Sequence, residues 1–176
     1  METLNEVLPQ DIVLLLKMTT NSKITWQNVA LSQSLQVSGK EITESIERCI
    51  KARLLDQTKQ EVNIAALQEF LVKRIKERFP AQPGLYGHGI PTAFSASPIK
   101  EHFYKGTKEF VWETLKGTVK GQTIEPLYRT VPEIIKNDSE LYELLVIVDA
   151  LRIGKSQEIE IATNELAIKF AKYSRN

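Results

Sequence analysis

Side chains that commonly perform catalysis or bind metals are few in this sequence and far apart. There are two histidines, His88 and His102, fourteen positions apart, and one cysteine, Cys49. Metal sites use His and Cys ligands in short regular spacings, and neither a second cysteine nor an HExxH pattern is present. A loop site around Tyr86 and His88 is the one enzymatic alternative, but no nucleophile with an accompanying base and acid supports it. We therefore expect no catalytic residue, no metal, no cofactor and no enzymatic activity.

Three further features could take part in chemistry but have simpler structural explanations. Residues 84–89, GLYGHG, superficially resemble a phosphate-binding loop, but the Lys-Ser/Thr that should follow is missing. Cys49 falls on the apolar side of a predicted helix, which indicates a buried thiol rather than a redox sensor. Asp149 and Arg152 are three positions apart near the end of another predicted helix, which favours a structural ion pair.

Recognition of DNA is a second kind of chemistry, and the residues after position 37 have side chains that could take part in it. Ser38 is followed three positions later by Glu41, the capping-box pattern of a helix start. The positions that repeat at helical spacing and predict the buried side of this helix are Ile42, Ile46, Cys49 and Ile50. Lys40, Thr43 and Glu44 then point outward. Ser38 and Thr43 can donate to phosphate oxygens, Lys40 can bind guanine or phosphate, and Glu44 can accept from cytosine.

The preceding elements must position this helix. Pro9 can open a helix at residues 9–20, with Asp11 in its first turn. A second helix is predicted at residues 27–34, capped by Thr25. Only Gln36 and Val37 separate it from the third helix, so the two helices must cross at a steep angle.

After the third helix, residues 54–62 predict a short hairpin with Lys59 and Gln60 at its tip. Asn63 can cap a fourth helix, which Pro80 ends. In a DNA complex Lys59 and Gln60 would contact the minor groove or the DNA backbone, and Arg48 would lie beside the major groove.

Residues 31–42, LSQSLQVSGKEI, resemble the helix-turn-helix of bacterial winged-helix regulators of the MarR and ArsR kind. The pattern of that family reads L-A-x-x-L-G-L-S-x-x-x-V, and the matching positions are Leu31, Leu35, Val37, Ser38 and Ile42. Ser32 replaces the usual Ala, and Gln36 replaces a Gly that relaxes the turn. Gln in a left-handed backbone would cost about 1 kcal/mol. The resemblance covers residues 9–79 and implies a winged helix-turn-helix whose third helix enters the major groove of double-stranded DNA.

The rest of the chain predicts small β elements and further helices. Residues 80–108 form a Pro/Gly-rich connecting segment whose embedded apolar residues indicate an ordered structure. Residues 110–112 and 118–120 read as the strands of a short β-hairpin. Helices are predicted at residues 131–136, from 138 or 139 to Gly154, and from Ser156 onward. The fold class is thus mainly α with small β elements (α+β), with a winged helix-turn-helix domain at 1–79, a connecting segment at 80–108 and a dimerisation or partner-binding region at 109–176.

Composition indicates an ordinary soluble protein: 42% of residues are hydrophobic, 26% are charged, and the net charge is +1. No apolar run approaches the roughly 20 residues of a membrane helix. The first fifteen residues contain no Lys or Arg, so we expect no secretory signal and a cytoplasmic location.

These observations lead to two functional hypotheses. The first is a sequence-specific transcriptional regulator that binds DNA as a homodimer, because one recognition helix reads only one half-site. The second is a winged-helix module that binds another protein, such as an antitoxin or a complex subunit, through the third helix or through residues 80–176. Lys40 with Glu44, and Glu47 with Lys51, have the spacing of ordinary solvated helix pairs, which keeps the second hypothesis open.

Overall fold

The computed structural model describes residues 2–103 and 108–175. The predicted segments 1–79, 80–108 and 109–176 therefore include residues 1, 104–107 and 176, which lie outside the described part. A 3-10 helix, η1 (Glu2–Glu6), precedes α1 (Pro9–Thr20), which has the predicted bounds. Two helices, α2 (Asn28–Leu35) and α3 (Gly39–Lys51), follow. Gln27, not Thr25 as predicted, is the residue before α2, and it makes no side-chain cap.

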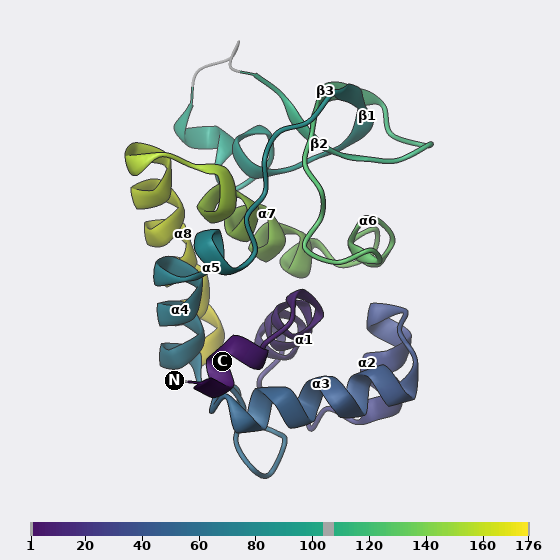
Figure 1. The fold of residues 1–176 in the computed structure, drawn as a ribbon, viewed down its shortest axis with the longest axis vertical. Coiled ribbons are helices and arrows are strands. Elements are labelled where there is room, and N and C mark those ends of the chain that lie inside the picture. Colours follow the sequence, from purple (N-terminus) through teal and green to yellow (C-terminus); the bar gives the residue numbers. More distant parts are fainter. Residues whose placement is uncertain (1, 104–107, 176) are drawn as a thin grey trace.

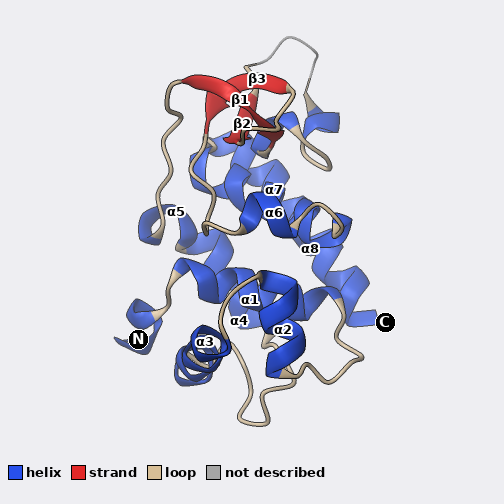
Figure 2. Cartoon of the chain, turned by 90° about the vertical axis from the view of Figure 1, so that its right-hand side faces the viewer, coloured by secondary structure: helices blue, strands red, loops and turns tan. Residues whose placement is uncertain are grey.

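The corner between α2 and α3 is sharp because Gln36 adopts a left-handed backbone, with φ of 53°. The amide of Val37 closes the end of α2 by donating to the Ser32 carbonyl at 3.2 Å. The predicted capping box is confirmed: the Glu41 amide donates to Ser38 Oγ at 3.1 Å, and the Ser38 amide donates to Glu41 Oε2 at 2.9 Å. Figure 2 shows α3 end-on and α2 from its side, so the two axes cross steeply.

The chain after α3 forms a loop and a divided helix. A single β-bridge joins Leu55 to Val62, and a loop lies between these residues. Asn63 caps α4 (Ile64–Lys73) as predicted, by accepting from the Ala66 amide. The helix predicted to reach Pro80 is interrupted at Arg74, which leaves the helical region (φ −127°, ψ −21°), and resumes as α5 (Ile75–Arg78).

A small three-stranded sheet lies at the end of the molecule opposite α3 (Figure 1). Its strands are β1 (Tyr86–Pro91), β2 (Phe110–Glu113) and β3 (Val119–Thr123). The sequence did not predict β1, which lies inside the segment expected to be a connection. β1 pairs antiparallel with both other strands, with His88 opposite Lys120 and Ile90 opposite Trp112.

The predicted β-hairpin is wrong, because β2 and β3 run parallel where they meet, with Phe110 opposite Gln122. Each takes its antiparallel partner from β1, so the three strands close on one another. A glycine makes this closure possible: a Cβ on Gly89 would lie 1.9 Å from the Trp112 carbonyl oxygen. Only a residue without a side chain lets β1 approach β2 so closely.

One continuous hydrophobic core joins the N-terminal helices to the C-terminal half, which we define as residues 80–175. α7 (Ser139–Ile153) lies at its centre and contacts α1, α5 and α8 (Ser156–Arg175). Every residue from Leu144 to Arg152 is buried, so no face of α7 in this stretch meets water. The short helices of the C-terminal half are η2 (Ala93–Ser95), η3 (Lys100–His102) and α6 (Val131–Ile134).

A buried polar network ties the small sheet to α7. Asp149 accepts hydrogen bonds from Trp112 Nε1 and Thr92 Oγ1, each at 2.7 Å. Arg152 donates to the other carboxylate oxygen of Asp149 at 2.9 Å and to the Phe79 carbonyl, also at 2.9 Å. The expected structural ion pair between Asp149 and Arg152 is thus present. The three side chains that donate to Asp149 come from three different segments of the chain.

The described residues form a mixed α/β fold with eight α-helices and three strands. None of the helices in the described ranges combines the length and the apolar character needed to cross a bilayer.

Candidate nucleic-acid interface

The first two turns of α3 present their polar residues to solvent. Ser38, Lys40, Thr43 and Glu44 are all exposed. The Lys40 side chain is 85% exposed and that of Glu44 50%, and Lys40 Nζ lies 3.9 Å from Glu44 Oε1. The solvated pair predicted from the spacing of these residues is therefore present. Because both side chains are exposed, breaking this ion pair to let Lys40 or Glu44 bind a ligand would cost little free energy.

The hydroxyl groups of Ser38 and Thr43 differ in whether their proton is already used in a hydrogen bond. Thr43 Oγ1 donates to the Gly39 carbonyl at 3.1 Å and receives a hydrogen bond from Asn28 Nδ2 at 3.3 Å. Ser38 Oγ only accepts, from the Glu41 amide. The Ser38 proton is thus available to a ligand such as phosphate, whereas Thr43 would first have to give up a bond within its own helix.

Arg48, predicted to lie beside the DNA, is bound to Asp11 instead. Its Nε donates to Asp11 Oδ2 at 2.8 Å and its Nη2 to Oδ1 at 2.9 Å, and the hydrogen bonds with Asp11 raise the pKa of Arg48. The Asp11 side chain is fully buried and that of Arg48 is 21% exposed. Because this ion pair neutralises a buried carboxylate, Arg48 has a structural role.

The loop between Leu55 and Val62 holds Lys59 and Gln60 at the end of the molecule where α3 lies (Figure 1). Both are exposed, and Lys59 has a left-handed backbone, with φ of 65°. Asp56 shapes the loop: its Oδ1 accepts from the amides of Gln60 at 3.0 Å and Glu61 at 2.9 Å. Hydrogen bonds from Thr58 and from the Glu61 amide lower the pKa of Asp56, so this side chain is a carboxylate near neutral pH.

A groove of about 480 Å³ separates the end of α3 from this loop, and Lys51, Arg53 and Glu61 are among its lining residues. Arg53 stands at the position where helices commonly end with glycine, and its φ is 59°. The amides of Arg53 and Leu54 donate to the Ile50 and Cys49 carbonyls, which completes a Schellman motif. The motif therefore fixes the exposed Arg53 between α3 and the loop.

Positive and negative side chains balance on this surface. The cations on α3 and the loop that are not bound to a buried group are Lys40, Lys51, Arg53 and Lys59. The carboxylates on the same elements that are not held by the C-terminal half are Glu44, Glu47, Asp56 and Glu61. A surface that binds a polyanion usually carries an excess of cations, and this one does not.

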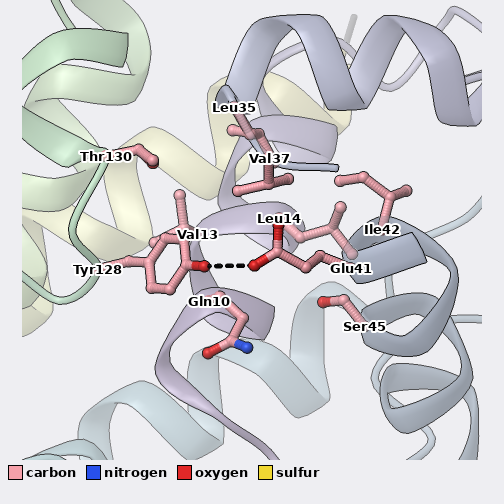
Figure 3. Close-up of a pocket in the computed structure, with 10 residues that line it drawn as sticks. All are labelled: Gln10, Val13, Leu14, Leu35, Val37, Glu41, Ile42, Ser45, Tyr128 and Thr130. Carbon is pink, nitrogen blue, oxygen red and sulfur yellow. Dashed lines mark hydrogen bonds between the residues drawn. The ribbon is translucent and has the colours of Figure 1, made fainter. Parts of the chain in front are cut away.

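Tyr128 and Arg129 of the C-terminal half reach the first turn of α3, and Figure 3 shows the contact between Tyr128 and Glu41. Glu41 Oε1 accepts from Tyr128 Oη at 3.1 Å and from Arg129 Nη2 at 3.0 Å. The Arg129 guanidinium also lies over the Tyr128 ring, 4.5 Å from its centroid. The hydrogen bond from the Ser38 amide, then those from Arg129 and Tyr128, lower the pKa of Glu41 to about 2. Glu41 is therefore a carboxylate at every physiological pH.

The residues first considered for catalysis or metal binding lie apart from this surface. Cys49 is buried as predicted, and burial raises the pKa of its thiol. His88 is exposed on β1, and His102 Nε2 lies 2.7 Å from Glu165 Oε1. Within residues 2–103 and 108–175, no group of three or more His, Cys, Asp or Glu side chains could hold a metal ion.

Sequence reasoning missed Tyr128 and Arg129 because they are almost ninety positions from Glu41 and belong to no recognisable pattern. The role of Arg53 had a signal, since the end of a predicted helix needs a left-handed residue and no glycine follows α3. Comparison with known proteins adds no further assignment: no family model, curated protein or solved structure matches this chain.

Proposed function

We propose that this protein is a winged helix-turn-helix DNA-binding regulator in which α3 enters the major groove. The observation that carries this proposal is the α2–α3 corner: Gln36 turns the chain so that the outward side of α3 meets solvent along its length. In helix-turn-helix proteins the second helix of such a pair reads base edges with residues near its N-terminus. Ser38, Lys40 and Glu44 occupy that position here.

The loop after α3 supports the same function. A helix-turn-helix followed by a loop that projects beside the recognition helix is the arrangement in which a wing contacts the DNA backbone or minor groove. Lys59 is exposed in this loop, and Arg53 is fixed between the loop and α3. The contact set that we propose is Ser38, Lys40, Glu44, Arg53, Lys59 and Gln60.

We propose that two copies of the chain bind together. One α3 covers one half-site of a few base pairs, and two copies related by a two-fold axis would read an inverted repeat. A palindromic site with half-sites about one helical turn apart is therefore the expected target.

The test is a salt titration of DNA binding. Fluorescence anisotropy would measure the affinity of the wild type for labelled fragments from upstream of its own coding region, between about 50 and 200 mM salt. A protein that makes several phosphate contacts loses orders of magnitude in affinity over such a range. The double variant Lys40→Ala/Lys59→Ala should bind more weakly at every salt concentration and show a slope smaller by about two phosphate contacts.

The matched control is Lys120→Ala/Lys155→Ala, which removes two exposed lysines outside the proposed contact set and changes the net charge equally. This control should bind DNA like the wild type. Equal affinities of the wild type and the Lys40→Ala/Lys59→Ala variant would show that α3 and the loop do not contact DNA.

The balance of charges on α3 and its loop favours a second candidate function, binding of a protein. Glu44 and Glu47 would lie close to DNA phosphates, which is unfavourable, whereas a partner with mixed charges could pair with both signs. Absence of any salt-dependent DNA binding by the wild type would favour this function.

A further inference from the structure

Glu41 is the point at which α3 is attached to the C-terminal half. Its two carboxylate oxygens have different partners: Oε2 accepts from the Ser38 amide within the capping box, and Oε1 accepts from Tyr128 and Arg129. Among the described residues, no other side chain of α3 forms a hydrogen bond with the C-terminal half. The same carboxylate thus fixes the start of α3 and connects it to a segment that follows the sheet.

The apolar contact around this attachment contains one small gap. A cavity of about 10 Å³, room for roughly one water molecule, lies between Val37 of the corner, Val13 of α1, and Tyr128 and Thr130 of the C-terminal half. The buried Thr130 hydroxyl has no hydrogen-bond partner in the described part of the chain. The polar contacts of Glu41 lie beside this cavity and join its two sides.

Tyr128 and Arg129, which donate to Glu41, also contact each other. Arg129 stacks on the Tyr128 ring, so neither side chain has to lose much freedom to meet Glu41. The Arg129 side chain is 62% exposed and that of Glu41 31%. The contact therefore lies at the edge of the interface between α3 and the C-terminal half, where it can be broken without exposing the core.

We infer that Tyr128 and Arg129 are positioning residues that hold the first turn of α3 in the orientation that binds DNA. This inference rests on the proposed function. Through this contact the C-terminal half determines how strongly α3 binds DNA, although neither Tyr128 nor Arg129 touches the duplex.

The test is a double-mutant cycle on DNA affinity. Glu41→Gln is a suitable first variant because Gln is the other residue that completes a capping box, so α3 keeps its cap while an amide nitrogen replaces the oxygen that accepts from Tyr128 and Arg129. Arg129→Ala is the second, and the combination is the third. Each single variant should bind DNA about three- to tenfold more weakly than the wild type. The double variant should bind no more weakly than Glu41→Gln, because Glu41→Gln already removes the carboxylate oxygen with which Arg129 pairs.

Two controls separate positioning from other roles. Lys136→Ala removes a cation of the C-terminal half that pairs with Glu133, away from α3, and should leave affinity unchanged. Arg129→Lys keeps the charge and one donor and should recover part of the affinity. Melting temperatures of Arg129→Ala, Arg129→Lys and Lys136→Ala measured alongside should change little, since exposed ion pairs add little to folding stability.

The outcomes are distinguishable. A salt slope that falls by about one in Arg129→Ala but not in Glu41→Gln, with losses that add up in the double variant, would mean that Arg129 contacts phosphate directly, which overturns the inference. Affinity of Arg129→Ala equal to that of the wild type also overturns it while the proposed function stands. If the wild type binds no DNA, both the proposed function and the inference about Tyr128 and Arg129 are wrong.

Discussion

Arg48 and Asp11 form a bidentate ion pair in which the carboxylate is fully buried. The carboxylate accepts hydrogen bonds from both Nε and Nη2 of the guanidinium, at 2.8 and 2.9 Å. Asp11 also accepts from the Leu8 amide at 2.8 Å and from Ser45 Oγ. One acidic side chain therefore joins the start of α1 to the inner side of α3.

The first prediction concerns this pair. Arg48→Met leaves the Asp11 carboxylate buried without its cation, and we expect the free energy of unfolding in urea to fall by about 3 kcal/mol. DNA affinity of the remaining folded protein should be unchanged. Arg53→Met, which removes an exposed arginine of the proposed contact set, should give the reverse result. If Arg48→Met is as stable as the wild type and binds DNA more weakly, Arg48 contacts DNA and does not have the structural role assigned to it.

The second prediction concerns the corner. Gln36 is exposed and held at a φ of 53°, a conformation that costs a residue with a side chain about 1–2 kcal/mol. Gln36→Gly should remove that cost. Because glycine loses more chain entropy on folding, by about 0.4–1 kcal/mol, we expect a net stabilisation of about 0.5 kcal/mol, visible as a higher urea midpoint.

Gln36→Ala is the control for the corner, since alanine keeps the strain and should not stabilise the protein. A Gln36→Gly variant less stable than Gln36→Ala would show that the corner does not need a left-handed residue.

The third prediction is a pH dependence. The pKa of Glu41 is lowered from 4.5 to about 2, so its ionised form is favoured in the folded state. A carboxylate whose pKa is depressed by folding adds stability that is fully present above about pH 4.5 and is lost as the pH falls toward 2. The difference in unfolding free energy between the wild type and Glu41→Gln should be constant from pH 7 to about pH 5 and should shrink below it.

Glu41 is the carboxylate by which the two proteins differ, so the difference in unfolding free energy isolates it. A difference that keeps its full size down to pH 2.5 would contradict the assigned contacts.

The fourth prediction concerns Asp149. Asp149→Ala would leave Arg152, Trp112 Nε1 and Thr92 Oγ1 buried without their common acceptor, at a cost of about 3–5 kcal/mol in thermal or urea unfolding. The double variant Asp149→Leu/Arg152→Met should be more stable than Asp149→Ala, because it removes the unpaired charge as well. If the single variant loses less than about 1 kcal/mol, the network does not hold the sheet on α7.

Much of the helical structure could be predicted because its signals are local. Pro9, the Ser38–Glu41 capping box, the Asn63 cap and Gly154 each act within one turn of the helix that they begin or end, so the sequence alone places those boundaries. The left-handed position of Gln36 was likewise predictable, because the winged-helix pattern that residues 31–42 resemble has a Gly at this position. The burial of Cys49 and the pairing of Asp149 with Arg152 followed from helical spacing.

Tertiary structure alone decided the contacts between distant segments. β1 has two glycines and a proline in six residues and no alternation of apolar and polar side chains, because it is defined by its close approach to β2 and β3 rather than by its own side chains. Arg48 had the same local signal as an exposed arginine, and only the meeting of α1 with α3 assigned it to Asp11. Glu41 could be predicted as a cap within its own helix, but Tyr128 and Arg129 reach it through folding of the chain between them. Local sequence fixes hydrogen bonds within a turn, whereas the partner of a long polar side chain depends on which segments the core brings together.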